Sequence, residues 1–225
     1  IINHKEFQFN EFININNISY SYGQNHNTLN NLSLQIKKGE RVAIIGESGA
    51  GKSTLINIIL GLLKPSSGEI EVDGKNIYDN LKGWQGQLGY VPQDIYLLDD
   101  TITNNIAIWD EDIDLNQVKE SIKLAALSEL VKGLPDGLNT VIGENGIRFS
   151  GGERQRLGLA RALYSKPKVI ILDEATSSLD VGTEKDIMES IYSLTRDCTI
   201  IIITHRKTTI YGCDNVYQIK DQRII

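Results

Sequence analysis

The sequence is poor in the residue types that mark disulfide-stapled or nucleic-acid-binding domains. Its 225 residues include only two cysteines, Cys198 and Cys213, which form no CxxC pair. A disulfide framework is therefore excluded, a reducing cytosolic setting is the default, and both cysteines are expected to be small buried hydrophobic residues. Positive charge is also scarce, because 23 lysines and arginines stand against 29 aspartates and glutamates, for a net charge of −6. That balance argues against direct binding of nucleic acid.

Long apolar runs and a signal peptide are also missing. The longest apolar stretches, 55–63 and 199–203, fall short of the roughly 18–20 residues that a membrane-spanning helix needs. Residues 1–5 contain no apolar h-region of a signal peptide. Because the sequence does not start with methionine and contains only Met188, we expect an excised piece of a longer protein.

The apolar pattern predicts an α/β fold. Hydrophobic residues make up 40% of the chain, as in ordinary globular domains. In the first forty residues apolar and polar residues alternate between Asn- and Gly-rich breaks, which predicts antiparallel strands. Further strands are predicted at 41–45, 70–72, 88–91, 169–172 and 199–203. Strands that alternate with helices indicate a mostly parallel sheet.

Periodic apolar residues predict the helices and the division of the chain. The expected helices cover 53–63, 116–131, a stretch that starts after Ser150 and stops before Pro167, and 184–194. A largely helical insert from about 101 to 165 interrupts the α/β core. We therefore predict three parts: an antiparallel β-subdomain with the first part of the core (1–94), an α-helical subdomain (95–165) and the rest of the core (166–225).

A phosphate-binding loop is the most specific local motif. The stretch Gly46-Glu47-Ser48-Gly49-Ala50-Gly51-Lys52-Ser53 matches G-x-x-x-x-G-K-[ST] between a predicted strand and a predicted helix. Glycines let successive N–H groups point at phosphate oxygens, and the helix start adds its positive dipole. Lys52 would contact the β- and γ-phosphates, and the Ser53 hydroxyl would ligate Mg²⁺. The absence of an N-K-x-D element disfavours a guanine nucleotide.

Two carboxylates follow a second buried strand. Val169-Ile-Ile-Leu172 is followed at once by Asp173 and Glu174. Ligands of such sheets bind beyond the carboxyl ends of the strands. Asp173 would hold Mg²⁺, directly or through water, and Glu174 would act as general base on the attacking water or polarise it.

A third motif marks a helix start. The stretch Ser150-Gly151-Gly152-Glu153 has the S-x-x-E pattern of a capping box, and apolar residues recur after it at helical spacing. Two glycines at a helix N-terminus expose N–H groups that suit an anion. From these residues alone, a generic helix cap and an anion site both remain open.

The three motifs in this order resemble the ATP-binding domain of ABC transporters, over essentially the whole chain. Ser150-Gly151-Gly152 would be the signature of that family, although Phe149 stands where leucine is usual and Glu153 where glutamine is usual. The resemblance implies a P-loop ATPase core with a mostly parallel sheet, an N-terminal antiparallel β-subdomain and an inserted α-helical subdomain. It also implies ATP and Mg²⁺ as ligands.

The resemblance assigns roles to further single residues. Tyr22 matches the aromatic residue that stacks on adenine. Gln93 matches the glutamine that contacts Mg²⁺ and the attacking water, at the place where a membrane domain docks. The loop 177–180, with Asp180, matches the loop that communicates across a dimer, and His205 matches the histidine that contacts the γ-phosphate.

The expected site thus draws on the whole chain. The expected catalytic residues are Lys52, Gln93, Glu174 and His205. The expected metal ligands are Ser53, Gln93 and Asp173. The expected nucleotide contacts are Tyr22, Gly46, Glu47, Ser48, Gly49, Ala50, Gly51, Lys52, Ser53, Thr54, Gln93, Ser150, Gly151, Gly152, Glu153 and Asp180.

The resemblance also implies partners. The signature of one chain would reach the nucleotide held by a second chain, so two copies would close around two ATP molecules as a homodimer, with a heterodimer left open. The segments 93–106 and 140–146 resemble the exporter branch. That branch implies a membrane domain fused upstream, a lipid, oligosaccharide or peptide as cargo, and a position on the cytoplasmic face of the inner or plasma membrane. The fold is expected to run somewhat beyond Ile225.

Three alternatives remain open at this point. An importer-type ATPase subunit would carry the same motifs. A soluble ABC-type ATPase acting on nucleic acid or the ribosome is opposed by the net charge of −6. A nucleotide-binding regulatory domain that does not hydrolyse ATP is opposed by Glu174 and His205.

Overall fold

The protein consists of two compact units. In the computed structural model the first unit combines residues 1–88 with 195–225, and the second spans residues 89–194. The structure describes residues 7–23, 27–108, 110–176, 179–193 and 198–225. The three-part division into 1–94, 95–165 and 166–225 stays a prediction.

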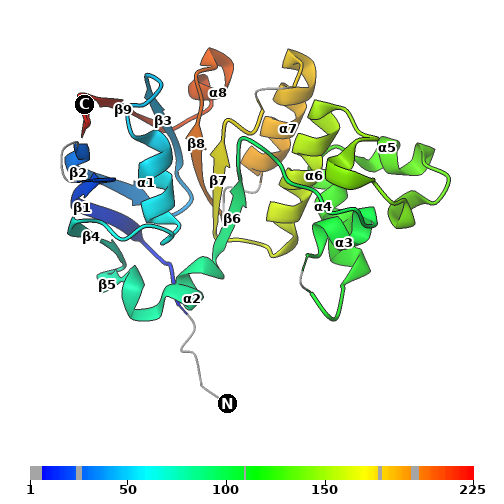
Figure 1. Ribbon diagram of the computed structural model, residues 1–225, viewed down its shortest axis with the longest axis horizontal. Helices are drawn as coiled ribbons and strands as arrows, with labels where there is room; N and C mark the ends of the chain where they lie inside the picture. The colour runs from blue at the N-terminus through cyan, green and yellow to red at the C-terminus, as the bar shows by residue number, and fades with distance from the viewer. Residues whose placement is uncertain (1–6, 24–26, 109, 177–178, 194–197) are drawn as a thin grey trace. The chain divides into compact units, whose positions relative to one another are not determined.

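The first unit contains a four-stranded antiparallel sheet near the N-terminus (Figure 1). Its strands, in the order β2-β1-β4-β5, are β1 (Phe12–Ser21), β2 (Asn27–Lys37), β4 (Ser67–Val72) and β5 (Lys75–Asn76). The side chains of Ile13, Ile15 and Ile18 on β1 have no exposed surface. Because successive side chains of a strand point to opposite faces, the alternating apolar pattern places one face of this sheet in the core.

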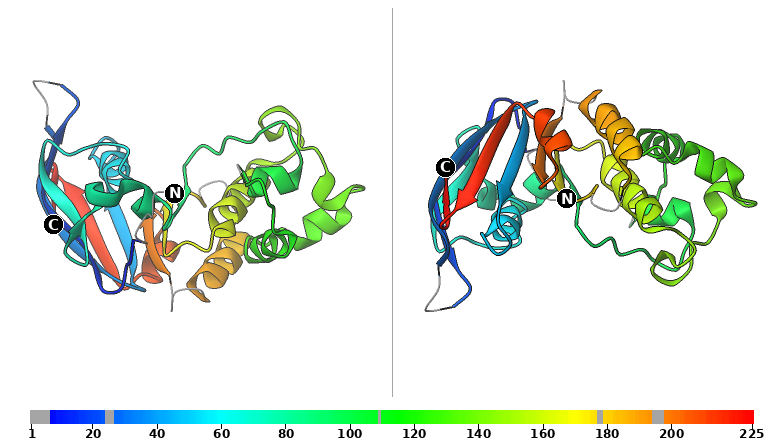
Figure 2. Two further views of the ribbon diagram at one scale, coloured as in Figure 1. Left: turned by 90° about the horizontal axis from the view of Figure 1, so that it is seen from below. Right: turned by 90° about the horizontal axis from the view of Figure 1, so that it is seen from above.

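A second group of strands in the same unit carries the phosphate loop. These strands, in the order β10-β9-β3-β8, are β3 (Arg41–Gly46), β8 (Thr199–Ile203), β9 (Asn215–Lys220) and β10 (Arg223–Ile224). β3 pairs in parallel with β8, as the buried apolar runs at 41–45 and 199–203 predict. β3 also pairs in parallel with β9, a strand that no apolar run predicts, and β10 pairs antiparallel with β9. Figure 2 shows the antiparallel sheet lying as a separate layer against β9 and β3.

Short helices complete the first unit. They are α1 (Lys52–Ile59), the 3-10 helix η1 (Ile77–Asn80), α2 (Leu81–Gln85) and α8 (Lys207–Tyr211). α1 ends earlier than the predicted Leu63, because Gly61 adopts a left-handed φ of 69° and the Leu62 and Leu63 N–H groups both donate to the Asn57 carbonyl. The buried Trp84 indole donates to the Ile59 carbonyl at 2.7 Å and satisfies this helix end.

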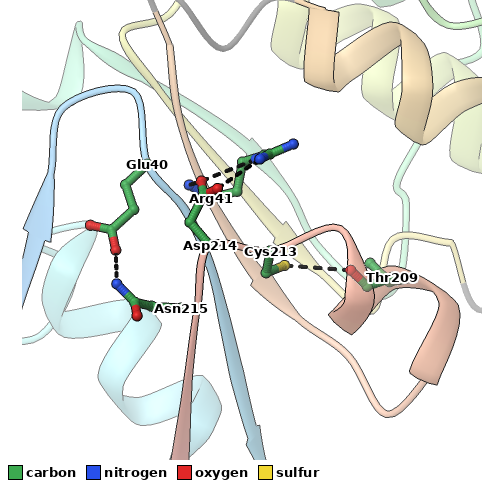
Figure 3. A network of polar contacts seen from close by, with 6 residues as sticks. All are labelled: Glu40, Arg41, Thr209, Cys213, Asp214 and Asn215. Atoms are coloured by element: carbon green, nitrogen blue, oxygen red, sulfur yellow. Dashed lines mark hydrogen bonds and ion pairs between the residues drawn. The ribbon is translucent and has the colours of Figure 1, made fainter.

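An ion pair anchors the start of β9 to the start of β3 (Figure 3). The guanidinium of Arg41 donates to the two carboxylate oxygens of Asp214 at 2.6 and 3.1 Å, and the Arg41 backbone N–H donates to one of them at 2.9 Å. These hydrogen bonds hold the pKa of Asp214 below its ordinary value. Beside the pair, the Asn215 amide donates to Glu40.

The turn after β4 holds the chain where it enters β1. The backbone N–H groups of Asn10, Glu11 and Phe12 donate to the Asp73 carboxylate at 2.6 to 2.9 Å. Asp73 and Gly74 both have positive φ, as a tight Asp-Gly turn between β4 and β5 requires. One side chain therefore ties two segments that are about sixty residues apart.

The second unit is mainly helical. Its strands β6 (Leu88–Val91) and β7 (Val169–Asp173) are neighbours in one sheet. Its helices are α3 (Ile102–Ile106), α4 (Leu115–Leu124), α5 (Ser128–Gly133), the 3-10 helices η2 (Gly137–Asn139) and η3 (Glu144–Gly146), α6 (Gly151–Tyr164) and α7 (Val181–Ser193). α6 lies against α3 and α4 (Figure 1) and buries Leu157, Ala160 and Leu163. The predicted helical insert in an α/β chain is confirmed.

The prediction of one helix over 116–131 is wrong. The chain forms α4 and α5 instead, because Ala126 between them has a left-handed φ of 53°. This break allows Ala125 and Leu127 to be fully buried. The guanidinium of Arg156 donates to the Ala126 carbonyl at 3.1 Å and holds the break against α6.

Two further expectations concern single residues and spans. Cys198 is buried as expected, whereas Cys213 is only partly buried, because its thiol lies at the end of α8 and donates to the Thr209 carbonyl at 3.4 Å. Among the described residues no helix is both long and apolar enough to cross a bilayer.

Candidate active site

The phosphate loop joins β3 to α1 in the first unit. Gly49 and Gly51 have left-handed φ values of 79° and 104°. A Cβ atom at Gly51 would lie 2.8 Å from the Thr28 carbonyl oxygen and 2.7 Å from a methyl group of Leu29, so only glycine fits there. The tight curl of the loop therefore depends on these glycines.

The start of α1 suits a phosphate group. Its N-cap Gly51 makes no side-chain cap, so side chains leave the first-turn N–H groups for another acceptor. The Lys52 ammonium is buried and donates to the carbonyls of Gly46 and Glu47, both at 2.8 Å. Ser53 is exposed beside it. A positive charge held within uncapped N–H groups fits the phosphate chain of a nucleotide.

Tyr22 lies within reach of this helix. The buried Thr54 hydroxyl donates to the Tyr22 hydroxyl at 3.3 Å, and the ring of Tyr20 packs edge-on against the ring of Tyr22 at 4.9 Å. The side chain of Tyr22 is nevertheless 65% exposed. A ring that is fixed at one edge and open to solvent is free to stack on a planar ligand.

His205 stands at the same edge of the sheet as the loop. Ile203 at the end of β8 pairs with Ile44 on β3. Gly46 follows two residues after Ile44, and the exposed His205 follows two residues after Ile203. The parallel register thus brings His205 and the phosphate loop to one edge of the first unit.

The second unit holds the two carboxylates. All five residues of β7 are buried, and Asp173 is its last residue. Burial and the adjacent Asp173 carboxylate, with which it is hydrogen-bonded, raise the pKa of Tyr90 on β6 to about 12. Glu174 has a left-handed φ of 48° and is partly exposed. The backbone turns sharply after the strand and sets the two carboxylates in different surroundings.

Gln93 follows β6 with an exposed side chain. Because β6 is the neighbour of β7, Gln93 and Asp173 belong to adjacent strands of the second unit. Among the described residues no group of three or more His, Cys, Asp or Glu side chains could hold a metal ion by itself. Gln93 and Asp173 offer an amide oxygen and a carboxylate, which are oxygen donors of the kind that Mg²⁺ prefers.

The comparison with known families decides the assignment. The sequence pattern described as "ABC transporter" matches residues 29–177, about two thirds of the chain. The chain belongs to the ABC transporter family. The predicted fold class and the predicted ATPase domain of an ABC transporter are thereby confirmed.

Several relatives within the ABC transporter family are named as flippases or export proteins. The chain is 43% identical over 211 residues to an ATP-dependent lipid A-core flippase of Coxiella burnetii, covering 92% of the chain and 36% of the flippase. It is 40% identical over 215 residues to a putative multidrug export ATP-binding/permease protein of Staphylococcus aureus, covering 95% and 37%. A bacterial Atm1-family ABC exporter solved with ATP bound superposes with a TM-score of 0.93 at 35% identity, covering 100% of this chain and 40% of that one.

These relatives favour the exporter branch over the importer and soluble alternatives. The chain spans between 36% and 37% of the length of the two curated relatives above.

Residues 150–153, the predicted signature, form the predicted capping box at the start of α6. The Glu153 N–H donates to the Ser150 hydroxyl at 3.3 Å, and the Ser150 N–H donates to the Glu153 carboxylate at 2.7 Å. The Ser150 hydroxyl also donates to that carboxylate at 2.8 Å. Glu153 therefore acts here as a helix cap, and the partly exposed Gly151 and Gly152 form the first turn.

Asp180 is the residue directly before α7 in the same unit. Its exposed carboxylate accepts from the Thr183 N–H at 3.0 Å, and hydrogen bonds from Thr183 lower its pKa. This cap starts α7 at Val181, three residues before the predicted start. Residues 177 and 178 of the predicted loop lie outside the described residues.

The predicted site residues thus fall into two groups. The first unit brings Tyr22, residues 46–54 and His205 together, and the second unit contains Gln93, residues 150–153, Asp173, Glu174 and Asp180. Sequence reasoning missed Tyr90 beside Asp173. The alternating pattern of β6 marks Tyr90 only as the residue between two buried positions, and so carries no signal for that contact.

Proposed function

We propose that this chain is the ATP-hydrolysing domain of an ABC exporter, which powers the transport of a substrate across a membrane. The observation that carries the proposal is the uncapped, glycine-dependent start of α1 with its buried Lys52 ammonium. The ATP-bound state of the Atm1-family neighbour supports ATP as the nucleotide.

In this proposal the residues of the two groups divide the work. Lys52 and the N–H groups of the loop bind the phosphates, and Tyr22 stacks on adenine. Glu174 accepts a proton from the water that attacks the γ-phosphorus, so that ADP and inorganic phosphate leave. His205 contacts the γ-phosphate.

Mg²⁺ is part of the proposal because of the oxygen donors available. Ser53, Gln93 and Asp173 would hold it, and when bound it neutralises charge on the phosphates during transfer. The remaining predicted nucleotide contacts, including Ser150–Glu153 and Asp180, would belong to the site of a second chain. The closed form would thus be a homodimer with two shared sites.

The membrane part is inferred from the relatives. The Staphylococcus aureus relative is named as both ATP-binding protein and permease, and this chain covers only 37% of it. We propose a membrane domain on the same polypeptide, with this domain on the cytoplasmic face of the membrane. A lipid, an oligosaccharide or a peptide would be the cargo.

Replacement of Glu174 tests the hydrolytic role. In the full-length protein, Glu174→Gln should lower kcat for ATP hydrolysis by a factor of about 100 to 1,000, because general-base catalysis contributes on that scale. ATP binding should persist, since the amide removes only the proton acceptor. Glu189→Gln, on exposed α7 surface, is the matched control. Near-normal turnover of Glu174→Gln would remove Glu174 from the role of base.

A further inference from the structure

A partly buried arginine joins the signature helix to the segment that begins at Gln93. Arg161 lies on α6, and its Nε donates to the Asn105 carbonyl at 2.8 Å. Its Nη1 donates to the Tyr96 carbonyl at 2.9 Å, and its Nη2 donates to the Asn105 side-chain oxygen at 3.2 Å. One guanidinium thus binds two points of the chain that are nine residues apart.

The side chain of Asn105 links separate residues within the same segment. Its side chain is 1% exposed. The side-chain oxygen accepts from the Leu98 N–H at 2.9 Å, and the side-chain nitrogen donates to the carbonyls of Leu98 and Thr101, both at 3.0 Å. Residues 98–105 therefore form a closed loop, and Arg161 fastens that loop to α6.

Packing by itself does not require a charged residue at position 161. Burial lowers the pKa of Arg161, which reflects the cost of removing its charge from water. An apolar side chain would fill such a position at lower cost, but it would leave the segment free to slide. Three directional hydrogen bonds instead fix the segment in both position and orientation.

The two elements that Arg161 joins carry different parts of the proposed site. The segment begins at Gln93, and its Tyr96 side chain is 66% exposed. α6 begins at the capping box of Ser150. Arg161 is eleven residues further along the same helix, so α6 is a rigid connection between the two.

We propose that Arg161, together with Asn105, is a positioning residue that makes the segment 93–106 and the signature helix move as one body. The position of Gln93 is then fixed relative to Ser150–Gly152 through α6. This role rests on the proposed function, because it concerns how the shared ATP site is assembled.

The test uses the full-length protein in lipid nanodiscs with Arg161→Lys, Asn105→Ala and the double variant. Lysine keeps the charge but loses the forked donor geometry. We expect kcat for ATP hydrolysis to fall about tenfold with KM for ATP within about twofold, because misplacement affects the reacting geometry rather than ATP binding in the phosphate loop. The double variant should lose no more than the more severe single variant, since the two residues act as a unit.

Hydrogen exchange provides a readout that needs no ATP. Arg161→Lys should speed exchange of the amides in 98–105 at least about tenfold. The matched control is Arg156→Lys, because Arg156 lies on the same helix and donates to a backbone carbonyl, that of Ala126, outside the segment. It should leave both kcat and exchange in 98–105 unchanged.

The outcomes separate the two claims. Unchanged exchange in 98–105 would show that Arg161 does not hold the segment against α6, and would overturn the proposal. Faster exchange with unchanged kcat, or a fall in kcat matched by an equal rise in KM, would reduce Arg161 to a structural residue. An inactive parent protein would contradict the proposed function. The exchange experiment would still decide whether Arg161 holds the segment 98–105 against α6.

Discussion

The two helix starts that carry the motifs are built in opposite ways. α1 begins after a left-handed Gly51, has no side-chain cap and keeps a buried ammonium beside its first turn. α6 begins at Ser150, whose side chain and backbone are both hydrogen-bonded to Glu153. α1 therefore offers its first-turn N–H groups to a ligand, whereas in α6 the Glu153 N–H is already bonded to the Ser150 hydroxyl.

This difference indicates a division of labour between the two starts. A helix end without a cap is costly unless an anion supplies the missing acceptors, so α1 is built for tight phosphate binding. A helix end with a capping box already satisfies part of its first turn and depends less on a bound ligand for its stability. The start of α6 therefore suits a contact that forms and breaks, as a shared dimer site requires.

Removal of the ammonium at α1 should have the largest effect. Lys52→Ala should weaken ATP binding about 100-fold, because charge-assisted contacts to phosphate are lost. Titration with a fluorescent ATP analogue measures this change. Lys75→Ala, which replaces an exposed lysine of the same unit, should bind normally. An unchanged affinity in Lys52→Ala would refute the assignment of the phosphate loop.

Mixing variants extends that experiment to the dimer. Ser150→Arg should disable the start of α6 without touching α1. If the site is shared, mixed Ser150→Arg and Lys52→Ala chains should regain hydrolysis in one of their two sites. Activity of the mixture no higher than that of either variant alone would contradict the shared site.

Loss of the cap at α6 should have a smaller effect, on stability. Glu153→Ala should lower the free energy of unfolding by about 1 kcal/mol, since one reciprocal half of the capping box disappears. Glu153→Gln should lower it much less, because glutamine also accepts the Ser150 N–H. Urea unfolding compares the two. Equal losses would mean that the charge of Glu153, and not the cap, stabilises α6.

Loss of the ion pair between Arg41 and Asp214 (Figure 3) should have the smallest effect on the free energy of unfolding. This pair lies outside both helix starts and so serves as a reference for them. Arg41 lowers the pKa of Asp214. A lowered pKa in the folded state stabilises the fold above the unfolded value of about 3.9, and this stabilisation is lost as the pH falls through the folded value. Because the pair is partly exposed, Asp214→Asn should cost about 0.5 kcal/mol at pH 7.

The pH dependence checks this assignment. The difference in unfolding free energy between Asp214→Asn and the parent should shrink as the pH falls below about 4. A difference that stays constant in acid would mean that the ion pair does not carry the effect.

Features encoded by neighbouring residues could be predicted from the sequence. The phosphate loop, the buried strands and the capping box each depend on residues within about ten positions, and the local pattern contains all of them. The antiparallel pairing of β1 with β2 was predictable for the same reason, since the strands adjoin in the chain.

Features that depend on distant partners could not be predicted. Apolar spacing continues through Ala126, and the break there is held by Arg156, thirty residues away. The bonds between Arg161 and Asn105 span 56 residues. The hydrogen bonds of Asp73 to Asn10 span 63 residues. No local pattern marks these side chains, because most of their partners are backbone groups that every residue possesses.

The Asp73 carboxylate has a mechanical consequence. A force applied to the chain before Asn10 would first act on the three hydrogen bonds that backbone N–H groups donate to the Asp73 carboxylate, and only then on the strand pairing of β1. The load would then spread through the turn after β4 into the antiparallel sheet, where the β1–β4 ladder resists it in shear.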